Sequence, residues 1–336
     1  MKYLITGHTG FKGTWLSLLL KNRGHQVFGI ALDPIRNSLF TNIEAEGLFE
    51  CDARFNIENT KQFLSLVRDI SPDFIIHLAA QSLVKEGYRS PFNTYATNVL
   101  GTASVLTAIR EIPLKGSLII TTDKVYKPSN LLKAFNEMDE IGGEDPYSSS
   151  KSIADKLTQN WISNYPHLKI GIARAGNVIG GGDVASDRLV PYVIKAVSEE
   201  KPPVLRYPKA IRPWQHVLDC LNGYLVFLEK ISENCETRIL NFGPYESDYK
   251  SVEELTELIL TLYNSKLNWE NDLIEHQKES HFLALDSTKA YEILKWKNKW
   301  SFEESVNRTY SWYASLKNGK SPLEACLEDI HLFEKS

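Results

Sequence analysis

The chain has 336 residues, enough for one large domain or two closely packed ones. Its 43% hydrophobic and 24% charged residues are typical of a folded soluble protein. With a net charge of −4, the protein as a whole has no electrostatic attraction to nucleic acid or to an anionic membrane. No apolar run approaches the roughly 18 residues of a membrane span. Because only Met1 and Lys2 precede the first apolar run, we expect no secretory signal and a cytoplasmic location.

Short apolar runs alternate with amphipathic segments through the first half of the chain. The expected strands are Tyr3–Thr6, Gln26–Ala31, Phe74–Leu78, Ser117–Thr121 and Lys169–Arg174. The expected helices between them are Thr14–Asn22, Thr60–Ile70, Thr94–Arg110 and Ser149–Ser163. This alternation predicts an α/β fold with a Rossmann-type, doubly wound parallel sheet that helices cover on both faces.

Three glycines, Gly7, Gly10 and Gly13, follow the first expected strand and open the first expected helix. Glycine permits a tight turn and lets the backbone approach a pyrophosphate, whose charge the helix N-terminal amides would face. Asp33 lies about 20 positions further on, where an acidic residue binds the adenosine ribose of a dinucleotide. The pattern therefore favours a dinucleotide site, and the alternative is a plain turn between a strand and a helix.

Two charged residues in and after this loop affect the choice of cofactor. Asp33 would repel a 2′-phosphate, so NAD is predicted over NADP, although Lys12 could offset that repulsion. His8 is expected either near the pyrophosphate or in solvent.

A strand of the first half runs into the sequence Thr122-Asp123-Lys124. Parallel sheets place their chemistry at the carboxyl ends of strands, so a hydroxyl, an acid and an amine there suggest a catalytic cluster. The alternative is a turn with solvated charges.

Tyr147 and Lys151 stand four residues apart and share one face if this segment is helical. A tyrosine acts as a base near neutral pH only if its pKa falls by about three units, and a nearby ammonium favours the phenolate. The pattern alone is common, and a solvated helix pair is the alternative. After a dinucleotide-binding half it predicts hydride-transfer chemistry.

The regular alternation of apolar runs and amphipathic segments ends after Arg174. Gly180–Gly182 and several prolines interrupt the chain, and helical patterns return at Val217–Ile231 and Val252–Tyr263. We expect residues 1–178 with 214–244 to form the NAD-binding domain, and residues 179–213 with 245–336 to form a smaller, mixed α/β substrate lobe. The glycine run would let backbone approach the nucleotide or would serve as a hinge.

No metal site or disulfide framework is indicated. The cysteines include no CxxC pair, so free thiols are expected, and the histidines are scattered. Glu275-His276 has no partner at ligand spacing. A Ser-His-Asp triad remains open, but no nucleophile-elbow motif is present.

Taken together, motifs across nearly the whole chain resemble the extended short-chain dehydrogenase/reductases, and among them the CDP-glucose 4,6-dehydratase family. The stretches that carry the resemblance are TGHTGFKGTWLSLLL, HLAAQSLV, YATNVLGT, TTDKVY, DPYSSSK, ARAGNVIGGGD, DRLVP, AIRPWQHV, NFGP and LDSTKAYEILKWKNKW. Asp123 with Lys124 is the sharpest feature. Epimerases usually have a small residue there, and dTDP-glucose dehydratases usually have glutamate in place of Lys124. The segment 127–144 lacks the tryptophan-rich stretch expected of the family, and it should border the active site.

The resemblance implies a role for each matching residue. The implied NAD-binding residues are Gly7, Gly10, Phe11, Gly13, Asp33, Asp52 (which would meet the adenine), Ala79, Ala80, Asn98, Tyr147 and Lys151. The implied catalytic residues are Thr122, Asp123, Lys124, Tyr147 and Lys151. The implied nucleotide-sugar ligands are Gln81, Asn177, Arg188, Arg212 and His216.

The implied reaction converts CDP-glucose to CDP-4-keto-6-deoxyglucose, a step of deoxysugar biosynthesis such as that for lipopolysaccharide O-antigen. Tyr147 would act in C4 oxidation, Asp123 as a protonated acid and Lys124 as a desolvated base in water elimination across C5 and C6. The sequence leaves those two protonation states open. A homodimer is implied through the helices after Thr94 and Tyr147, or a tetramer built from it.

Three other functions stay open from the sequence. GDP-, dTDP- or UDP-linked sugars could replace the CDP-linked substrate, and a 4-epimerase would share most of the motifs. A non-catalytic NAD sensor would not need Tyr147, Lys151 and Asp123, all of which this chain keeps.

Overall fold

The computed structural model describes residues 1–129, 132–185, 187–274 and 280–336. Glu275 and His276 lie outside the described residues. The main body is a sheet of seven parallel strands in the order β11-β6-β5-β4-β1-β2-β3. Its strands are β1 (Lys2–Thr6), β2 (Gln26–Ala31), β3 (Cys51–Arg54), β4 (Phe74–His77), β5 (Gly116–Thr122), β6 (Ile170–Ala175) and β11 (Ile239–Phe242). This confirms the predicted doubly wound sheet.

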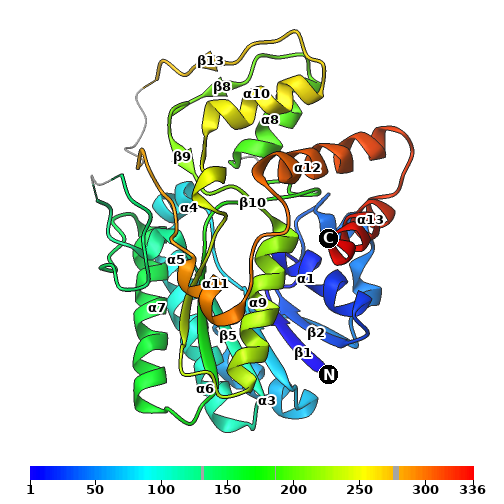
Figure 1. Cartoon of the computed structure of the whole chain (residues 1–336). Helices are drawn as coiled ribbons and strands as arrows, with labels where there is room; N and C mark the ends of the chain where they lie inside the picture. The colour runs from blue at the N-terminus through cyan, green and yellow to red at the C-terminus, as the bar shows by residue number, and fades with distance from the viewer. Residues whose placement is uncertain (130–131, 186, 275–279) are drawn as a thin grey trace.

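Helices cover both faces of the sheet (Figure 1). One face packs against α3 (Thr60–Ile70), α6 (Gly101–Glu111) and α7 (Pro146–Asn164), and the other packs against α1 (Phe11–Asn22) and α9 (Val217–Ser232). Neighbouring strand residues alternate between the two cores, as the period of two requires. Leu4 belongs to the first core, for example, and Ile5 to the second.

The order of the strands changes direction between β1 and β4. Strands β2 and β3 follow on one side of β1, and β4, β5 and β6 follow on its other side. Ligands of such sheets bind outside the carboxyl ends of the strands at this switch point. β5 and β6 end at the same edge, so the loops after all four strands can contribute to one site.

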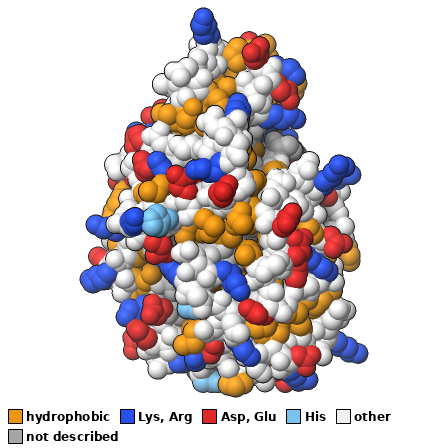
Figure 2. Space-filling model, turned by 90° about the vertical axis from the view of Figure 1, so that its right-hand side faces the viewer, with side chains coloured by type: hydrophobic (Ala, Val, Ile, Leu, Met, Phe, Trp, Pro, Cys, Tyr) orange, Lys and Arg blue, Asp and Glu red, His pale blue; other side chains and the backbone are white. Residues whose placement is uncertain are grey.

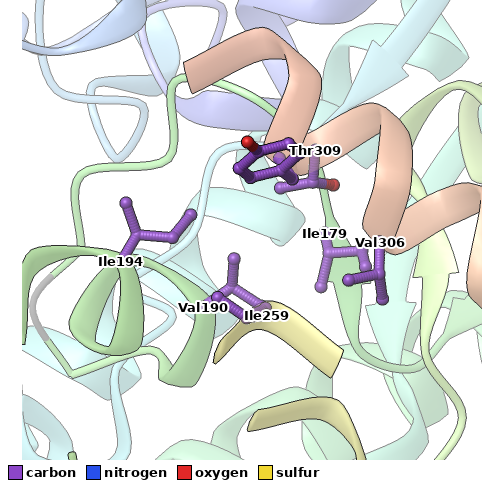
Figure 3. Close-up of a pocket in the computed structure, with 7 residues that line it drawn as sticks. Ile179, Val190, Ile194, Ile259, Val306 and Thr309 are labelled. Carbon is purple, nitrogen blue, oxygen red and sulfur yellow. The ribbon is translucent and has the colours of Figure 1, made fainter. Parts of the chain in front are cut away.

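A smaller lobe stands above this edge in Figure 1. Its helices are α8 (Leu189–Ser198), α10 (Val252–Leu262) and α12 (Phe302–Lys317), which share an apolar core. Figure 3 shows side chains of this core, among them Ile179, Ile194 and Val306, pointing toward one another. The gap between them leaves no room for a water molecule, so it is a packing feature of the lobe.

The remaining elements are short, apart from the 14-residue helix α13. The helical ones are α2 (Leu39–Asn42), η1 (Ala45–Leu48), α4 (Val84–Arg89), α5 (Pro91–Tyr95), the π-helical turn η2 (Ala96–Leu100), η3 (Asp123–Val125), η4 (Glu246–Asp248), α11 (Thr288–Leu294) and α13 (Pro322–Lys335). The short strands are β7 (Val178–Ile179), β8 (Val204–Leu205), β9 (Ile211–Arg212), β10 (Gln215–His216), β12 (Lys250–Ser251) and β13 (Glu270–Asn271).

The C-terminal helix α13 packs with the first lobe. Its Cys326, Ile330 and Phe333 lie in the same core as Trp15 of α1. The end of the chain therefore shares the core of the first lobe, while the predicted domain boundaries themselves stay a prediction.

The described residues form neither a membrane-spanning helix nor a cluster suited to a metal ion. On the face in Figure 2, acidic and basic side chains are interspersed, as the small net charge leads one to expect. Among the described residues, no helix is long and apolar enough to cross a membrane, and no cluster of three or more His, Cys, Asp or Glu side chains could hold a metal ion. The four cysteines are free.

Candidate active site

The glycine loop joins β1 to α1 at the carboxyl edge of the sheet. Gly7 has a φ of 76°, which favours glycine, and a Cβ there would lie 2.7 Å from the Ala79 nitrogen. A Cβ on Gly13 would lie 2.3 Å from the Gly7 carbonyl oxygen. Helix α1 begins after Gly10 without a side-chain cap and without an acidic residue in its first turn. The first amides of α1 are thus open to an anion such as a pyrophosphate, so these residues fit a dinucleotide.

His8 is fully buried beneath this loop, so a solvent-facing position is wrong. Its Nε2 lies 2.8 Å from Oδ1 of Asp52, and a Cβ on Gly29 would come within 2.6 Å of its ring. Burial lowers the pKa of His8, against the opposing effect of Asp52. Asp52 also accepts a hydrogen bond from Arg54 at 2.6 Å. Asp52 is therefore held by these partners and is not among the residues that line the cleft, so its contact with adenine stays a prediction.

Asp33 lies just beyond β2, exposed and lining the cleft, as a ribose ligand should. The Lys12 ammonium donates to the Tyr224 hydroxyl of α9 at 3.3 Å and lies 5.6 Å from the centre of its ring. Lys12 therefore contacts α9 and also lines the cleft, and the offset of the Asp33 charge stays a prediction.

A continuous cleft of about 2290 Å³ runs along the carboxyl edge and under the small lobe. It brings most of the predicted site residues together. Those that line it are Gly7, Gly10, Phe11, Gly13, Asp33, Ala79, Ala80, Thr122, Asp123, Lys124, Tyr147, Lys151, Asn177, Arg188 and Arg212.

Helix α7 places Tyr147 and Lys151 on the wall of this cleft. The helix begins here because Asp145 caps it, accepting a hydrogen bond from the Ser148 amide at 3.0 Å, and because Pro146 occupies its first turn. Both Tyr147 and Lys151 are buried, so their protonation depends strongly on their neighbours.

The electrostatics of this pair differ from the expectation. Burial raises the pKa of Tyr147 to about 12, and a hydrogen bond with Thr122 opposes that shift. Burial lowers the pKa of Lys151 to about 8, and Asp155 opposes that shift. The Lys151 ammonium donates to the Ile120 carbonyl at 2.8 Å instead of to Tyr147. These protein groups alone therefore do not produce the expected lowering of the Tyr147 pKa.

The turn after β5 presents the remaining predicted catalytic residues. The Thr122 hydroxyl donates to Oδ1 of Asp123 at 2.9 Å, and Oδ2 of Asp123 has no hydrogen-bond partner among the described residues. Burial raises the pKa of Asp123, against the opposing effects of Lys124 and Thr122. This is the direction that a general acid requires. Lys124 is only half-buried, so the complete desolvation expected for a lysine base is not present.

Two arginines line the part of the cleft under the small lobe. Arg188 precedes α8 and pairs with Asp183, with 2.8 Å between Nη1 and Oδ2. Arg212 is buried, and its Nη1 donates to the carbonyls of Ile211 and Ser280 at 2.9 Å each. Arg212 is therefore not a surface arginine, whereas the Arg188 side chain is 39% exposed. Asp183 was not foreseen, although its position five residues before Arg188 is a signal that could have suggested it.

The glycine run Gly180–Gly182 is fixed in place, which argues against a hinge. The Trp15 indole donates to the Gly181 carbonyl at 3.0 Å, and a Cβ on Gly181 would come within 2.0 Å of the Trp312 ring. Gly180 and Gly182 do line the cleft, as the alternative expectation required.

Three further predicted residues do not reach the cleft. Asn98 is buried and fixes the backbone of Gln81, accepting from its nitrogen at 2.9 Å and donating to its oxygen at 3.0 Å. The Gln81 side chain donates to the Leu83 carbonyl and the Thr94 hydroxyl. His216 is fully buried and caps α9, where its Nδ1 accepts from the Leu218 amide. These side chains are thus engaged within the protein, and their contacts with cofactor or substrate stay predictions.

The divergent segment 127–144 does border the cleft, as expected. Pro128, Ser129, Leu132, Phe135 and Glu144 line it. The Phe135 ring stacks on the buried Tyr126 ring at a centroid distance of 4.9 Å.

Comparison with known proteins agrees with this geometry. A nucleotide loop and a Tyr-Lys pair at the carboxyl edge of a doubly wound sheet define a dinucleotide-binding protein of the short-chain dehydrogenase/reductase type. Residues 4–309 match the family described as GDP-mannose 4,6 dehydratase, and the chain belongs to that family. It is 36% identical to the CDP-glucose 4,6-dehydratase of Salmonella typhimurium, over 98% of this chain and 95% of the relative, which confirms the resemblance seen in the motifs.

Two solved structures show the same fold. The dTDP-glucose 4,6-dehydratase of Bacillus anthracis, in complex with NAD, superposes with a TM-score of 0.81 at 22% identity, over 96% of this chain and 99% of that one. The UDP-glucose 4-epimerase of Thermotoga maritima, with UDP-glucose, superposes with a TM-score of 0.84 at 20% identity, over 94% of this chain and 100% of that one. The fold is thus shared by dehydratases and epimerases, and the reaction has to be argued from the site.

Proposed function

We propose that the chain is a CDP-glucose 4,6-dehydratase that uses NAD and returns it unchanged. The observation that carries this proposal is the buried Asp123, whose Oδ2 has no partner among the described residues and whose carboxyl faces the same cleft as Tyr147. An epimerase eliminates nothing and needs no acid at this position. A dehydratase needs one to protonate the departing hydroxide. The 36% identical relative supports CDP-glucose as the substrate.

The cofactor would lie across the switch point of the sheet. Gly7, Gly10 and Gly13 would hold its pyrophosphate at the start of α1, and Asp33 would bind its adenosine ribose. The NAD complex of the structural relative supports the same choice. When bound, NAD would supply the hydride acceptor for oxidation at C4 and the hydride donor for reduction at C6.

The protein's own residues would move the protons. Tyr147 would take the proton of the 4-hydroxyl, which Thr122 would orient. The 4-ketone acidifies the C5 proton, which Lys124 would remove. Asp123, kept protonated by burial, would give its proton to the hydroxide that leaves C6, so that water departs. Hydride return to C6 requires a proton at C5, which Lys124 would give back. The product is then a 4-keto-6-deoxy sugar nucleotide with no net oxidation.

The diphosphate of the substrate would lie between Arg188 and Arg212, since a guanidinium matches phosphate in a bidentate fork. Arg188 would exchange Asp183 for phosphate. Asn177, on the loop after β6, would contribute a neutral hydrogen bond in the same cleft.

A homodimer through the helices after Thr94 and Tyr147 belongs to the same proposal. Large apolar side chains are exposed on adjacent elements there, with Phe92 of α5 81% exposed, Leu100 of η2 57% exposed and Ile153 of α7 43% exposed. Burying such a patch in a second copy would be favourable. We propose a cytoplasmic location, with a product that feeds deoxysugar synthesis such as that for O-antigen.

Isotope transfer tests the reaction. Purified protein with NAD⁺ is given CDP-glucose deuterated at C4, and the product is analysed by mass spectrometry and NMR. We expect loss of one water and deuterium at C6. Return of the label to C4 with inverted configuration would show an epimerase, and accumulation of reduced cofactor that carries the deuterium would show a simple dehydrogenase.

A further inference from the structure

A buried ion pair lies directly behind the Tyr147–Lys151 pair. Tyr147, Lys151 and Asp155 follow one another at intervals of four on α7, so they share a face of the helix. Arg174 of β6 donates to both carboxylate oxygens of Asp155 at 2.8 Å, and the Thr121 hydroxyl of β5 donates to the same carboxylate at 2.9 Å. The side chains of Asp155 and Arg174 are at most 1% exposed. The pair therefore locks α7 to the strands that carry the catalytic turn.

The Arg174 guanidinium also contacts Tyr126, on its side away from α7. Its Nη1 donates to the Tyr126 hydroxyl at 2.9 Å, and the guanidinium lies 5.0 Å from the centre of the Tyr126 ring. The Tyr126 hydroxyl in turn donates to Oδ1 of Asn241 on β11 at 2.7 Å. Tyr126 is 2% exposed and Asn241 is fully buried. Because these polar groups are buried, each depends on its neighbour in the network for a hydrogen bond.

Asn241, at the other end of this hydrogen-bond network, fixes the segment that contains Phe135 and lines the cleft. The Asn241 side-chain amide donates to the carbonyls of Phe135 and Asp286 at 2.9 and 3.2 Å. The Asn241 backbone nitrogen donates to the Glu137 carboxylate at 2.8 Å. The Phe135 ring stacks on Tyr126 at an interplanar angle of 3° and lines the cleft. One path of buried contacts thus leads from the helix face of Lys151 to the segment that borders the sugar site.

We propose that Tyr126 is a positioning residue that couples this wall to Lys151 through Arg174 and Asp155. The role of Lys151 rests on the proposed function, whereas the mechanical coupling does not. Without the Tyr126 hydroxyl, Arg174 loses an acceptor and Asn241 loses a donor, both in buried surroundings. Arg174 then shifts toward new acceptors, and Asp155 and the turn of α7 that carries Lys151 shift with it.

The coupling has a consequence for the charge on Lys151. The charged or titratable groups that act on it are Asp155 on its own helix, Lys12 on α1 and the buried His77 on β4. Asp155 favours the ammonium form, whereas Lys12 disfavours it. Displacing Asp155 therefore makes Lys151 lose its proton at a lower pH.

Tyr126→Phe is the test variant, because it removes one hydroxyl and keeps the ring against Phe135. Tyr249→Phe is the matched control. The Tyr249 hydroxyl also donates to a carbonyl near the cleft wall, that of Leu285 at 2.9 Å, but it contacts neither Arg174 nor Asp155. A second variant, Arg174→Lys, keeps the buried charge and removes the fork that reaches Asp155 and Tyr126 together.

Two measurements follow on the full-length protein. In amide hydrogen exchange, Tyr126→Phe and Arg174→Lys should accelerate exchange about tenfold in peptides of residues 147–155 and of residues 133–137 together, while the control should leave residues 147–155 unchanged. In steady-state kinetics with CDP-glucose, the two variants should lower kcat about tenfold with little change in KM, and should move the alkaline limb of the kcat profile to lower pH.

The outcomes separate the proposal from general loss of stability and from the proposed function. Wild-type exchange at residues 147–155 in both variants, or an unmoved alkaline limb in active variants, would overturn the coupling. A loss of kcat with an unmoved limb would show a merely structural tyrosine. If the wild-type protein turns over no nucleotide sugar, the proposed function fails, and the exchange result still decides whether Tyr126 couples the wall to α7.

Discussion

Replacing Gly13 by alanine should weaken NAD binding through a defined steric conflict. A Cβ on Gly13 would lie 2.3 Å from the Gly7 carbonyl oxygen and 2.6 Å from the His8 Cα. Ordinary carbon contacts lie at about 3.5 Å, so the loop would have to move by about 1 Å. Both obstructing atoms belong to the backbone, so no side chain can rotate away.

The size of the effect follows from the cost of overpacking. Forcing such a shift typically costs about 1–3 kcal/mol. If the displaced loop is the pyrophosphate cradle, that cost appears in cofactor affinity as a Kd for NAD⁺ about 5- to 150-fold higher. Isothermal titration of NAD⁺ into the wild-type protein and the Gly13→Ala variant measures the ratio directly.

Gly47→Ala provides the matched control. No atom lies within 4 Å of a Cβ built on Gly47, so the same chemical change is free of conflict there. We expect wild-type affinity for NAD⁺ in this variant. A Gly13→Ala protein that is less stable but binds NAD⁺ as tightly as wild type would refute the cradle and leave only a turn between strand and helix.

Three further predictions concern catalysis, stability and assembly. Asp123→Asn and Lys124→Met should each lower turnover of CDP-glucose at least about tenfold while the Kd for NAD⁺ stays unchanged, and wild-type turnover in both would remove the pair from the mechanism. Burial lowers the pKa of His77 to about 3, so its contribution to stability is complete above pH 6.5 and is lost as pH falls from 6.5 toward 3. Urea unfolding should show a loss of about 2 kcal/mol from this residue between pH 7 and pH 5, and a His77→Gln variant with the full wild-type pH dependence would contradict it. Phe92→Glu should shift the protein from dimer to monomer in analytical ultracentrifugation, whereas Met138→Glu, at a side chain 89% exposed elsewhere, should not; a Phe92→Glu dimer would place the interface on another face.

The layout of the first half was predictable from periodicity and turn chemistry. The strand Gln26–Ala31 and the helix Thr60–Ile70 agree with the expected bounds to the residue, because polar or capping residues mark both ends. The expected helix over residues 94–110 is longer and interrupted, since α5 leads into a π-helical turn before α6. Strand β3 was not foreseen because its four residues are half-buried and two of them are charged.

The site was predictable where backbone chemistry or strand ends determine it, and less so where a side chain can turn either way. Glycines and the residues after β5 reach the cleft as expected. Asp52, Asn98 and His216 occupy motif positions, yet each hydrogen-bonds the protein itself. The His8 partner of Asp52 and the Gln81 partner of Asn98 are distant in sequence, so a single sequence gives no sign of them, whereas His216 caps the helix that follows it.

Substrate turnover tests the central claim most directly. The purified protein with NAD⁺ would be incubated with CDP-, dTDP-, GDP- and UDP-glucose, and the product masses read. We expect loss of one water from CDP-glucose and no change in the other three. Loss of water from a different nucleotide alone would contradict the assigned carrier and direct attention to the part of the cleft wall that includes Ser129, Leu132 and Phe135. Unchanged masses for all four would contradict dehydration of glucose nucleotides altogether.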